Sequence, residues 1–178
     1  MIHDHAAWVS ELQRNVSFLY EKKDQRIWRS QSYIALEKRL MISCYIIRKL
    51  YDSKHISKAE FNGLVKLNQY NSLGLKAPFQ QSRKINEFYE LETPRKIEKP
   101  LSFVVNQIIH SFSFVFVFKA KNEIEGFAFN SDKTKRDALF LVTFSELIDV
   151  LSPIAGIYMG ETQLIQREDG AWEVLSEE

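Results

Sequence analysis

The sequence contains few of the residues that break or cross-link a chain. Among 178 residues there are one cysteine, Cys44, four prolines and six glycines. A single cysteine forms no internal disulfide, which is typical of proteins from a reducing cytosol. The scarcity of glycine leaves few positions where the backbone can approach a phosphate closely, and the sequence has no Gly-rich phosphate loop.

Long hydrophobic runs are absent as well. No uncharged apolar stretch reaches the roughly 18 residues of a membrane-spanning helix. The first residues lack a basic segment followed by an apolar one, so we expect no secretory signal peptide. Hydrophobic residues make up 45% of the chain and aromatic residues 13%, which excludes a wholly disordered protein. We therefore expect a folded cytoplasmic protein that does not bind a membrane.

Charge is distributed unevenly along the chain. Residues 1–100 contain 18 Lys and Arg against 11 Asp and Glu, whereas residues 101–178 contain 6 against 12. The first part therefore has a net charge of +7 and the second a net charge of −6. A basic half is typical of proteins that bind nucleic acid or an acidic partner. The alternative is that the two halves attract each other or present their charges to solvent on different faces.

The first half has the apolar spacing of helices. One helix is predicted by four apolar residues on one face: Trp8, Leu12, Val16 and Leu19. A second helix, over residues 28–51, is predicted by a stripe of five residues: Leu36, Leu40, Cys44, Ile47 and Tyr51. The capping box from Ser57 to Glu60 predicts the start of a third helix, which we extend through Leu67. We also expect a short helix over residues 82–91 and a polar connector over residues 93–100.

The second half changes period. Residues 101–110 have helical spacing, and alternating phenylalanines predict a strand over residues 112–118. Further strands are expected over residues 126–130 and 137–143, followed by a helix that ends before Pro153. Asp169-Gly170 predicts a turn between two short C-terminal strands, over residues 163–166 and 172–175.

These elements predict an α+β protein. We expect a helical N-terminal half packed on an antiparallel β-meander, with a further helix and a C-terminal hairpin. We interpret residues 1–178 as a single domain with a helical part (1–92), a connector (93–100) and an α/β meander part (101–178).

The strongest candidate for chemistry is the pair Asn106 and His110. Their spacing places both side chains on one face of the predicted helix. Asn-x-x-x-His resembles the end of the Arg-Asn-x-x-x-His signature of HEPN ribonucleases. That resemblance implies metal-independent RNA cleavage, in which His110 would move a proton on the ribose hydroxyl or the leaving oxygen.

The sequence departs from that family in two ways. The family is all-helical, whereas here a predicted strand follows the helix. Val105 stands where the family has its arginine, so the cation would come from elsewhere, and Arg48 and Arg83 are the candidates. The alternative is that Asn106 and His110 make structural contacts at a helix end.

A longer segment, Asn106-Gln-Ile-Ile-His-Ser111, is similar to one in small uncharacterised bacterial proteins. The similarity would span residues 101–151. It implies a bacterial, cytosolic setting and no particular activity.

The aromatic strands give two further hypotheses. Gly126-Phe-Ala-Phe129 resembles the core of the RNA-stacking motif of RRM domains, although Glu125 stands where that motif has a basic residue. We favour the alternative that Phe127 and Phe129 point into the core. A small-ligand pocket lined by the strand over residues 112–118 would require a cavity on its aromatic face.

We expect no metal and no cofactor. His3, Asp4 and His5 are potential ligands, but they lie together near the start of the sequence, and zinc requires three or four well-placed donors. Cys44 lies on the apolar stripe of the second helix, so we expect it to be buried and not to act as a nucleophile.

Two basic clusters are candidates for binding nucleic acid through its phosphates. One comprises Lys22, Lys23, Arg26 and Arg29, and the other Lys133, Lys135 and Arg136. A phosphate-binding groove would require the two clusters to converge.

Because no complete catalytic constellation is visible, our first hypothesis is a non-enzymatic interaction or accessory protein of a bacterial cytosolic system, with stress response or phage defence as its setting. We expect a protein partner and leave a homo-oligomer open. The alternative is a HEPN-like ribonuclease or nucleic-acid-binding protein that uses Asn106 and His110.

Overall fold

A computed structural model describes residues 5–76, 82–156, 164–166 and 172–174. Its helices are α1 (His5–Lys22), α2 (Ser30–Asp52), α3 (Lys58–Phe61), α4 (Ile85–Phe88), α5 (Leu101–Ile109) and α6 (Phe144–Gly156). Its strands are β1 (Leu64–Asn71), β2 (Arg95–Pro100), β3 (Ser111–Phe118), β4 (Ile124–Ser131), β5 (Ala138–Thr143), β6 (Leu164–Gln166) and β7 (Trp172–Val174).

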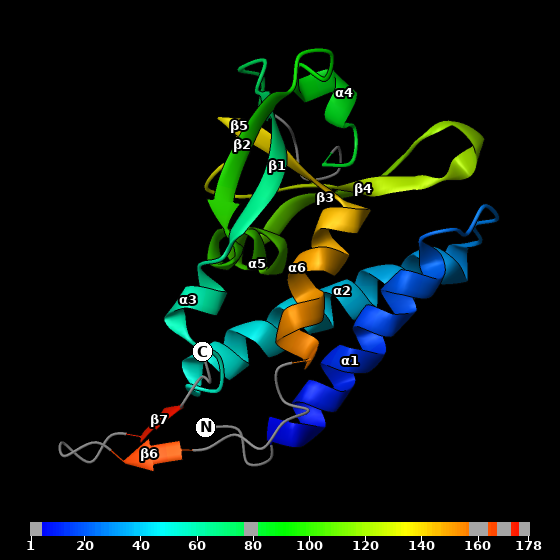
Figure 1. Ribbon diagram of the computed structural model, residues 1–178. Helices are drawn as coiled ribbons and strands as arrows, with labels where there is room; N and C mark the ends of the chain where they lie inside the picture. Colours follow the sequence, from blue (N-terminus) through cyan, green and yellow to red (C-terminus); the bar gives the residue numbers. More distant parts are fainter. Residues whose placement is uncertain (1–4, 77–81, 157–163, 167–171, 175–178) are drawn as a thin grey trace.

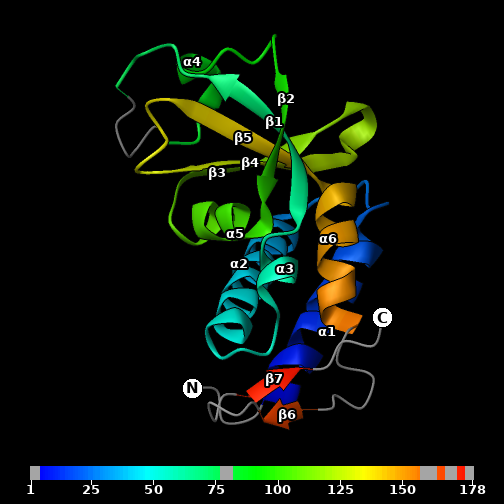
Figure 2. The same cartoon turned by 60° about the vertical axis from the view of Figure 1, so that its left-hand side comes forward.

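The protein has an α+β fold built on one five-stranded antiparallel sheet. The strand order is β2-β1-β5-β4-β3, so β2 and β3 form the two edges. Helix α5 packs between the sheet and α2. Helix α6 packs between the sheet and α1. Figure 1 shows the sheet above these two helices and the long α1–α2 hairpin below them. Figure 2 shows α4 on the far side of the sheet from α5.

The predicted α+β class and the meander β3-β4-β5 are confirmed. Both long N-terminal helices form, as does the helix that carries Asn106. The two C-terminal strands pair as β6 and β7, while Asp169 and Gly170 lie outside the described residues. No helix in the described part of the chain has the length and apolar character needed to cross a bilayer.

The prediction that residues 1–92 are helical is wrong at β1. The third helix ends at Phe61, and the chain continues as a strand in which Val65 and Leu67 are buried while Leu64 and Lys66 are exposed. The spacing Phe61, Leu64, Val65 fits a helix, but the alternation from Leu64 to Leu67 fits a strand equally well. Pairing with β2 and β5 stabilises the strand.

Two other boundaries also differ. The stretch that we expected to be a connector contains β2, which pairs with β1 along its whole length. Helix α6 does not end before Pro153 but continues to Gly156. Its last turn is held because Ile154 and Ala155 are buried, and because Gln13 Nε2 on α1 donates a hydrogen bond to the carbonyl oxygen of Ala155 (2.8 Å). Burial thus outweighs the backbone hydrogen bond that proline removes.

The core lies between the sheet and the helices. Phe127 and Phe129 are fully buried there, as expected for inward-facing residues. Cys44 is buried on α2, and desolvation raises the pKa of its thiol to about 12. Since the thiolate is the reactive form, this environment disfavours a nucleophilic role for Cys44.

Two histidines join the start of α1 to the loop after α2. The imidazole rings of His5 and His55 stack with their centroids 4.4 Å apart. Burial, and secondarily the charge of His5, lower the pKa of His55 below its ordinary value. His55 therefore takes up a proton less readily in the folded protein than in the unfolded chain as the pH falls through about 6.5, the unperturbed histidine pKa.

We expect the free energy of unfolding to fall as the pH is lowered from about 7.5 to about 5.5, and to fall less in His55→Gln. Urea denaturation of both proteins at each pH measures the difference. Equal losses in the two proteins would show that this stack is not a source of acid sensitivity.

Candidate functional site

Helix α5 places Asn106 on a partly exposed surface next to α2. The helix buries Leu101, Val104 and Ile108 against its neighbours, which leaves Asn106 half-buried on the other side. Arg48 of α2 donates a hydrogen bond from Nη1 to Asn106 Oδ1 (2.7 Å). Its Nε is 3.1 Å from Asp52 Oδ1, which forms an ion pair within α2. Asp52, Arg48 and Asn106 thus form one polar row across the two helices.

His110 ends α5 and is exposed to solvent. Its backbone N–H donates to the carbonyl oxygen of Asn106 (3.1 Å), one turn back along the helix. Among the described hydrogen bonds and ion pairs, none joins the His110 side chain to Arg48. The structure therefore brings Arg48 to Asn106 but does not complete a three-residue cluster with His110.

The two alternatives for the cation are separated by the fold. Val105, at the position of the HEPN arginine, is buried in the core. Arg83 lies two residues before α4, which packs on the opposite face of the sheet from α5 through Phe88. Of the two candidates, only Arg48 reaches the Asn106 surface.

The two basic clusters do not converge. Arg26 forms an ion pair with Glu123 (3.3 Å), just before the start of β4 at Ile124, whereas Lys133 follows the end of β4 at Ser131. The eight residues of β4 separate these points by roughly 25 Å. The two clusters therefore do not meet at one phosphate.

The cluster at the β4–β5 turn is held by local contacts. Lys135 forms an ion pair with Asp132 and lies over the ring of Phe112, 3.9 Å from its centroid. Lys133 and Arg136 are exposed. The residues of the turn itself include no large exposed hydrophobic side chain; Leu73, which is 46% exposed, follows Ser72, whose backbone N–H donates to the carbonyl oxygen of Asp137.

The other cluster is accompanied by exposed apolar side chains, which the sequence analysis missed. We call this surface the α1–α2 tip; it comprises Tyr20, Lys22, Lys23, Arg26, Ile27, Arg29 and Ile34. Ile27 is 76% exposed and Ile34 is 65% exposed. Ile34 lies two positions before Leu36, on the opposite side of α2 from the buried stripe. This position could have predicted from the sequence that Ile34 is exposed.

Aromatic contacts hold the α1–α2 tip against the β3–β4 turn. Trp28 Nε1 donates a hydrogen bond to the carbonyl oxygen of Asn122 (3.0 Å). The Trp28 ring contacts those of Tyr33 and Phe118. The aromatic face of β3 is thus covered by side chains from α2 and β4, which leaves no support for a ligand pocket on that face. Burial of Phe127 and Phe129 likewise removes the base-stacking surface that an RRM requires.

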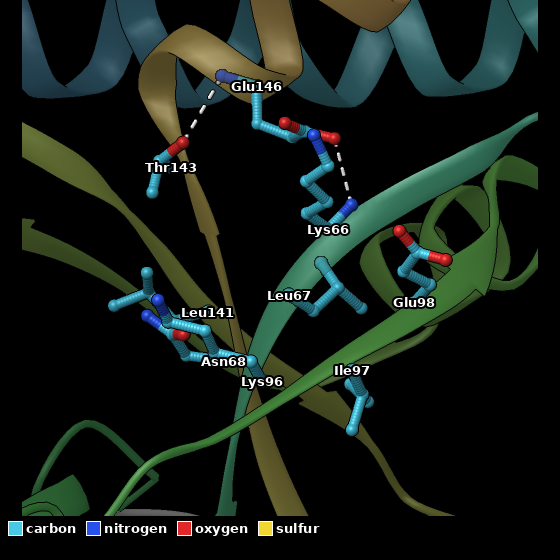
Figure 3. A pocket seen from close by; sticks show the side chains of 9 residues that line it. All are labelled: Lys66, Leu67, Asn68, Lys96, Ile97, Glu98, Leu141, Thr143 and Glu146. Carbon is cyan, nitrogen blue, oxygen red and sulfur yellow. Dashed lines mark hydrogen bonds between the residues drawn. The ribbon is translucent and has the colours of Figure 1, made fainter.

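A groove lies on the sheet near β1, β2 and β5 (Figure 3). It has a volume of about 640 Å³, and two of the residues that line it, Leu67 and Leu141, are buried. Two lysines, Lys66 and Lys96, and two glutamates, Glu98 and Glu146, line it. The Glu146 carboxylate accepts a hydrogen bond from the backbone N–H of Lys66 (2.8 Å). Charges of both signs line this groove equally, so it does not select an anionic or a cationic ligand.

The described residues include no group of three or more side chains placed to hold a metal ion. His3 and Asp4 lie outside those residues, and His5 stacks on His55.

No family model matches the chain, and no curated protein or solved structure matches it.

Proposed function

We propose that this chain is a non-enzymatic interaction protein that binds an acidic partner through the α1–α2 tip. The observation that carries the proposal is the exposure of Ile27 and Ile34 beside four basic residues. Apolar anchors surrounded by charge are typical of protein-binding surfaces. The four basic residues outnumber the acidic residues beside them, Glu21, Asp24 and Glu123, and this excess of positive charge favours an acidic partner.

The tip is positioned before any partner binds. The Trp28 contacts fix it to the β3–β4 turn, and Lys22 and Lys23 lie over the rings of Phe18 and Tyr20. A surface that is already ordered loses less conformational entropy on association, which favours affinity. The bacterial cytosolic setting is what the sequence resemblance implies, and the stress or phage-defence role is part of the proposal.

Site-specific photo-crosslinking in the cells that express this chain tests the proposal. A photo-reactive phenylalanine analogue at Ile27 is expected to capture a partner, whereas the same analogue at Leu64 is not. Leu64 is a matched control because it is 62% exposed and lies on β1, away from the tip. The double change Lys23→Glu/Arg29→Glu in the Ile27 background is expected to remove the adduct.

A second pair of charge reversals gives the specificity control. Lys133→Glu/Arg136→Glu changes the same number of charges at the β4–β5 turn and is expected to leave the adduct intact. No adduct from Ile27, or equal loss of adduct in both double variants, would contradict docking at the tip.

A second candidate function is metal-independent RNA cleavage, and the Arg48–Asn106 hydrogen bond favours it. In this hypothesis the ribose 2′-hydroxyl attacks phosphorus and the 5′-oxygen leaves. His110 would take the proton of the 2′-hydroxyl or give one to the 5′-oxygen, and water would carry the other proton. Arg48 would stabilise the charge that develops on the phosphorane oxygens.

Labelled single-stranded RNA and tRNA, incubated with the protein in the presence of EDTA, test this candidate. It predicts that His110→Ala and Arg48→Gln each lower the cleavage rate about 100-fold. Arg83→Gln is the control, since Arg83 is exposed on the other side of the sheet. Intact RNA with the folded wild-type protein would reject the candidate.

A further inference from the structure

The two edges of the five-stranded sheet differ in chemistry. Strand β2 has the sequence Arg-Lys-Ile-Glu-Lys-Pro, in which four of six residues are charged and the last is proline. Strand β3 has the sequence Ser-Phe-Ser-Phe-Val-Phe-Val-Phe, with no charge and no proline. Charges and proline protect an exposed edge against pairing with another strand. Edge β2 therefore has this protection, whereas edge β3 lacks it.

The unprotected edge is long and regular. β3 pairs with β4 from Ser111 to Phe118, and its two irregularities lie at the ends of the strand, between Ser111 and Ser113 and between Val117 and Phe118. On its other side, no strand in the described part of the chain pairs with it. The centre of β3 therefore presents a row of backbone donors and acceptors in the geometry that a further strand would satisfy.

The side chains of β3 are held in place on both faces. Phe114 and Phe116 pack on Phe127 of the core, and Phe116 and Phe118 contact Tyr33 of α2. On the other face, Val117 packs against the smaller cluster around Leu139. The strand is therefore an ordered template, and the side chains of its central residues remain half-buried.

We propose that a second copy of this chain pairs with β3 in antiparallel orientation, so that two five-stranded sheets become one continuous sheet. The unpaired backbone groups of β3 require a strand as their partner. Because β3 has no charged residue, an uncharged strand fits it best. β3 is its own complement: a twofold axis perpendicular to the sheet aligns phenylalanine with phenylalanine on one face and valine with valine or serine on the other. Such cross-strand aromatic pairs stabilise a sheet. Because each copy has one such edge, the assembly closes as a dimer.

Val115→Lys tests this dimer. Val115 is central in β3, pairs with Ala128 of β4 and is half-buried on the face opposite the phenylalanines. In the dimer, the two new lysines would lie close to each other across the twofold axis, and like charges there oppose pairing. Leu64→Lys makes the same kind of change at an exposed residue of β1, outside both β3 and the α1–α2 tip.

Sedimentation equilibrium over about a hundredfold range of protein concentration gives the readout. Wild type and Leu64→Lys are expected to reach twice the monomer mass of 20.9 kDa, and Val115→Lys to dissociate at least tenfold more readily. Hydrogen exchange of the wild type provides a second measurement that needs no variant: amides of residues 111–118 are expected to exchange more slowly at high concentration. A monomer throughout, a dimer unaffected by Val115→Lys, or exchange that is independent of concentration would overturn the proposal.

Discussion

Gly126→Ala is expected to lower the free energy of unfolding by about 3 kcal/mol or more. Gly126 is buried in β4 and lies opposite Thr143 of β5. A Cβ atom at this position would clash with the carbonyl oxygen of Val142 and would lie 2.9 Å from Thr143 Cα. These are backbone atoms of a paired strand, so the clash is relieved only by separating β4 from β5 next to the irregularity at Val117.

Gly156→Ala is the matched control for this prediction. Gly156 ends α6, and an added Cβ there would meet no atom within 4 Å. Its effect is expected to stay within about 0.5 kcal/mol of wild type. Chemical denaturation followed by circular dichroism measures both variants, and a Gly126→Ala protein as stable as Gly156→Ala would contradict the contact geometry.

The aromatic strands were predictable because their signal is local. The alternating phenylalanines from Phe112 to Phe118 have period two, and a strand is the element with that period. The apolar residues from Phe61 to Leu67 fit both the helical period and the strand period. The segment forms a strand because it pairs with β2 and β5, which lie far along the chain. Local pattern alone therefore could not decide between helix and strand there.

The candidate site shows the same division between local and distant information. The spacing of Asn106 and His110 predicts one face of one helix, and α5 has this helix with His110 at its C-terminal cap. That Arg48 is the cation beside Asn106 depends on how α2 packs against α5, a contact between residues 58 positions apart. Sequence named Arg48 as one of two alternatives and offered no physical basis for choosing it.

The basic clusters illustrate what composition cannot provide. A count of charges does not show that β4 holds Arg26 and Lys133 at opposite ends of a strand. The same count says nothing of Ile27 and Ile34, whose exposure distinguishes the α1–α2 tip from the β4–β5 turn. The positions of apolar residues outside the buried stripe thus point to a docking surface better than the net charge does.

Asn130→Ala is expected to lower the free energy of unfolding by about 3 kcal/mol. The Asn130 side chain is fully buried and joins three segments. Its Oδ1 accepts a hydrogen bond from the backbone N–H of Ser113 on β3 (3.2 Å), and its Nδ2 donates to Tyr89 Oη (2.6 Å) and to the Ala138 carbonyl oxygen (3.2 Å). Truncation leaves these groups buried without their partner, and each unsatisfied group costs about 1–3 kcal/mol.

Tyr89→Phe separates the two halves of this network. It removes the hydroxyl that accepts from Asn130 and donates to the Lys135 carbonyl oxygen (2.8 Å), while Asn130 keeps its bonds to Ser113 and Ala138. We expect a loss of about 1 kcal/mol, with β3 and β4 still paired. Urea denaturation gives both losses, and hydrogen exchange at Ser113 is expected to rise in Asn130→Ala but not in Tyr89→Phe. Equal losses of unfolding free energy in the two variants would show that the stabilisation comes from the Tyr89 hydroxyl. The Asn130 side chain would then not be needed to hold β3 to the sheet.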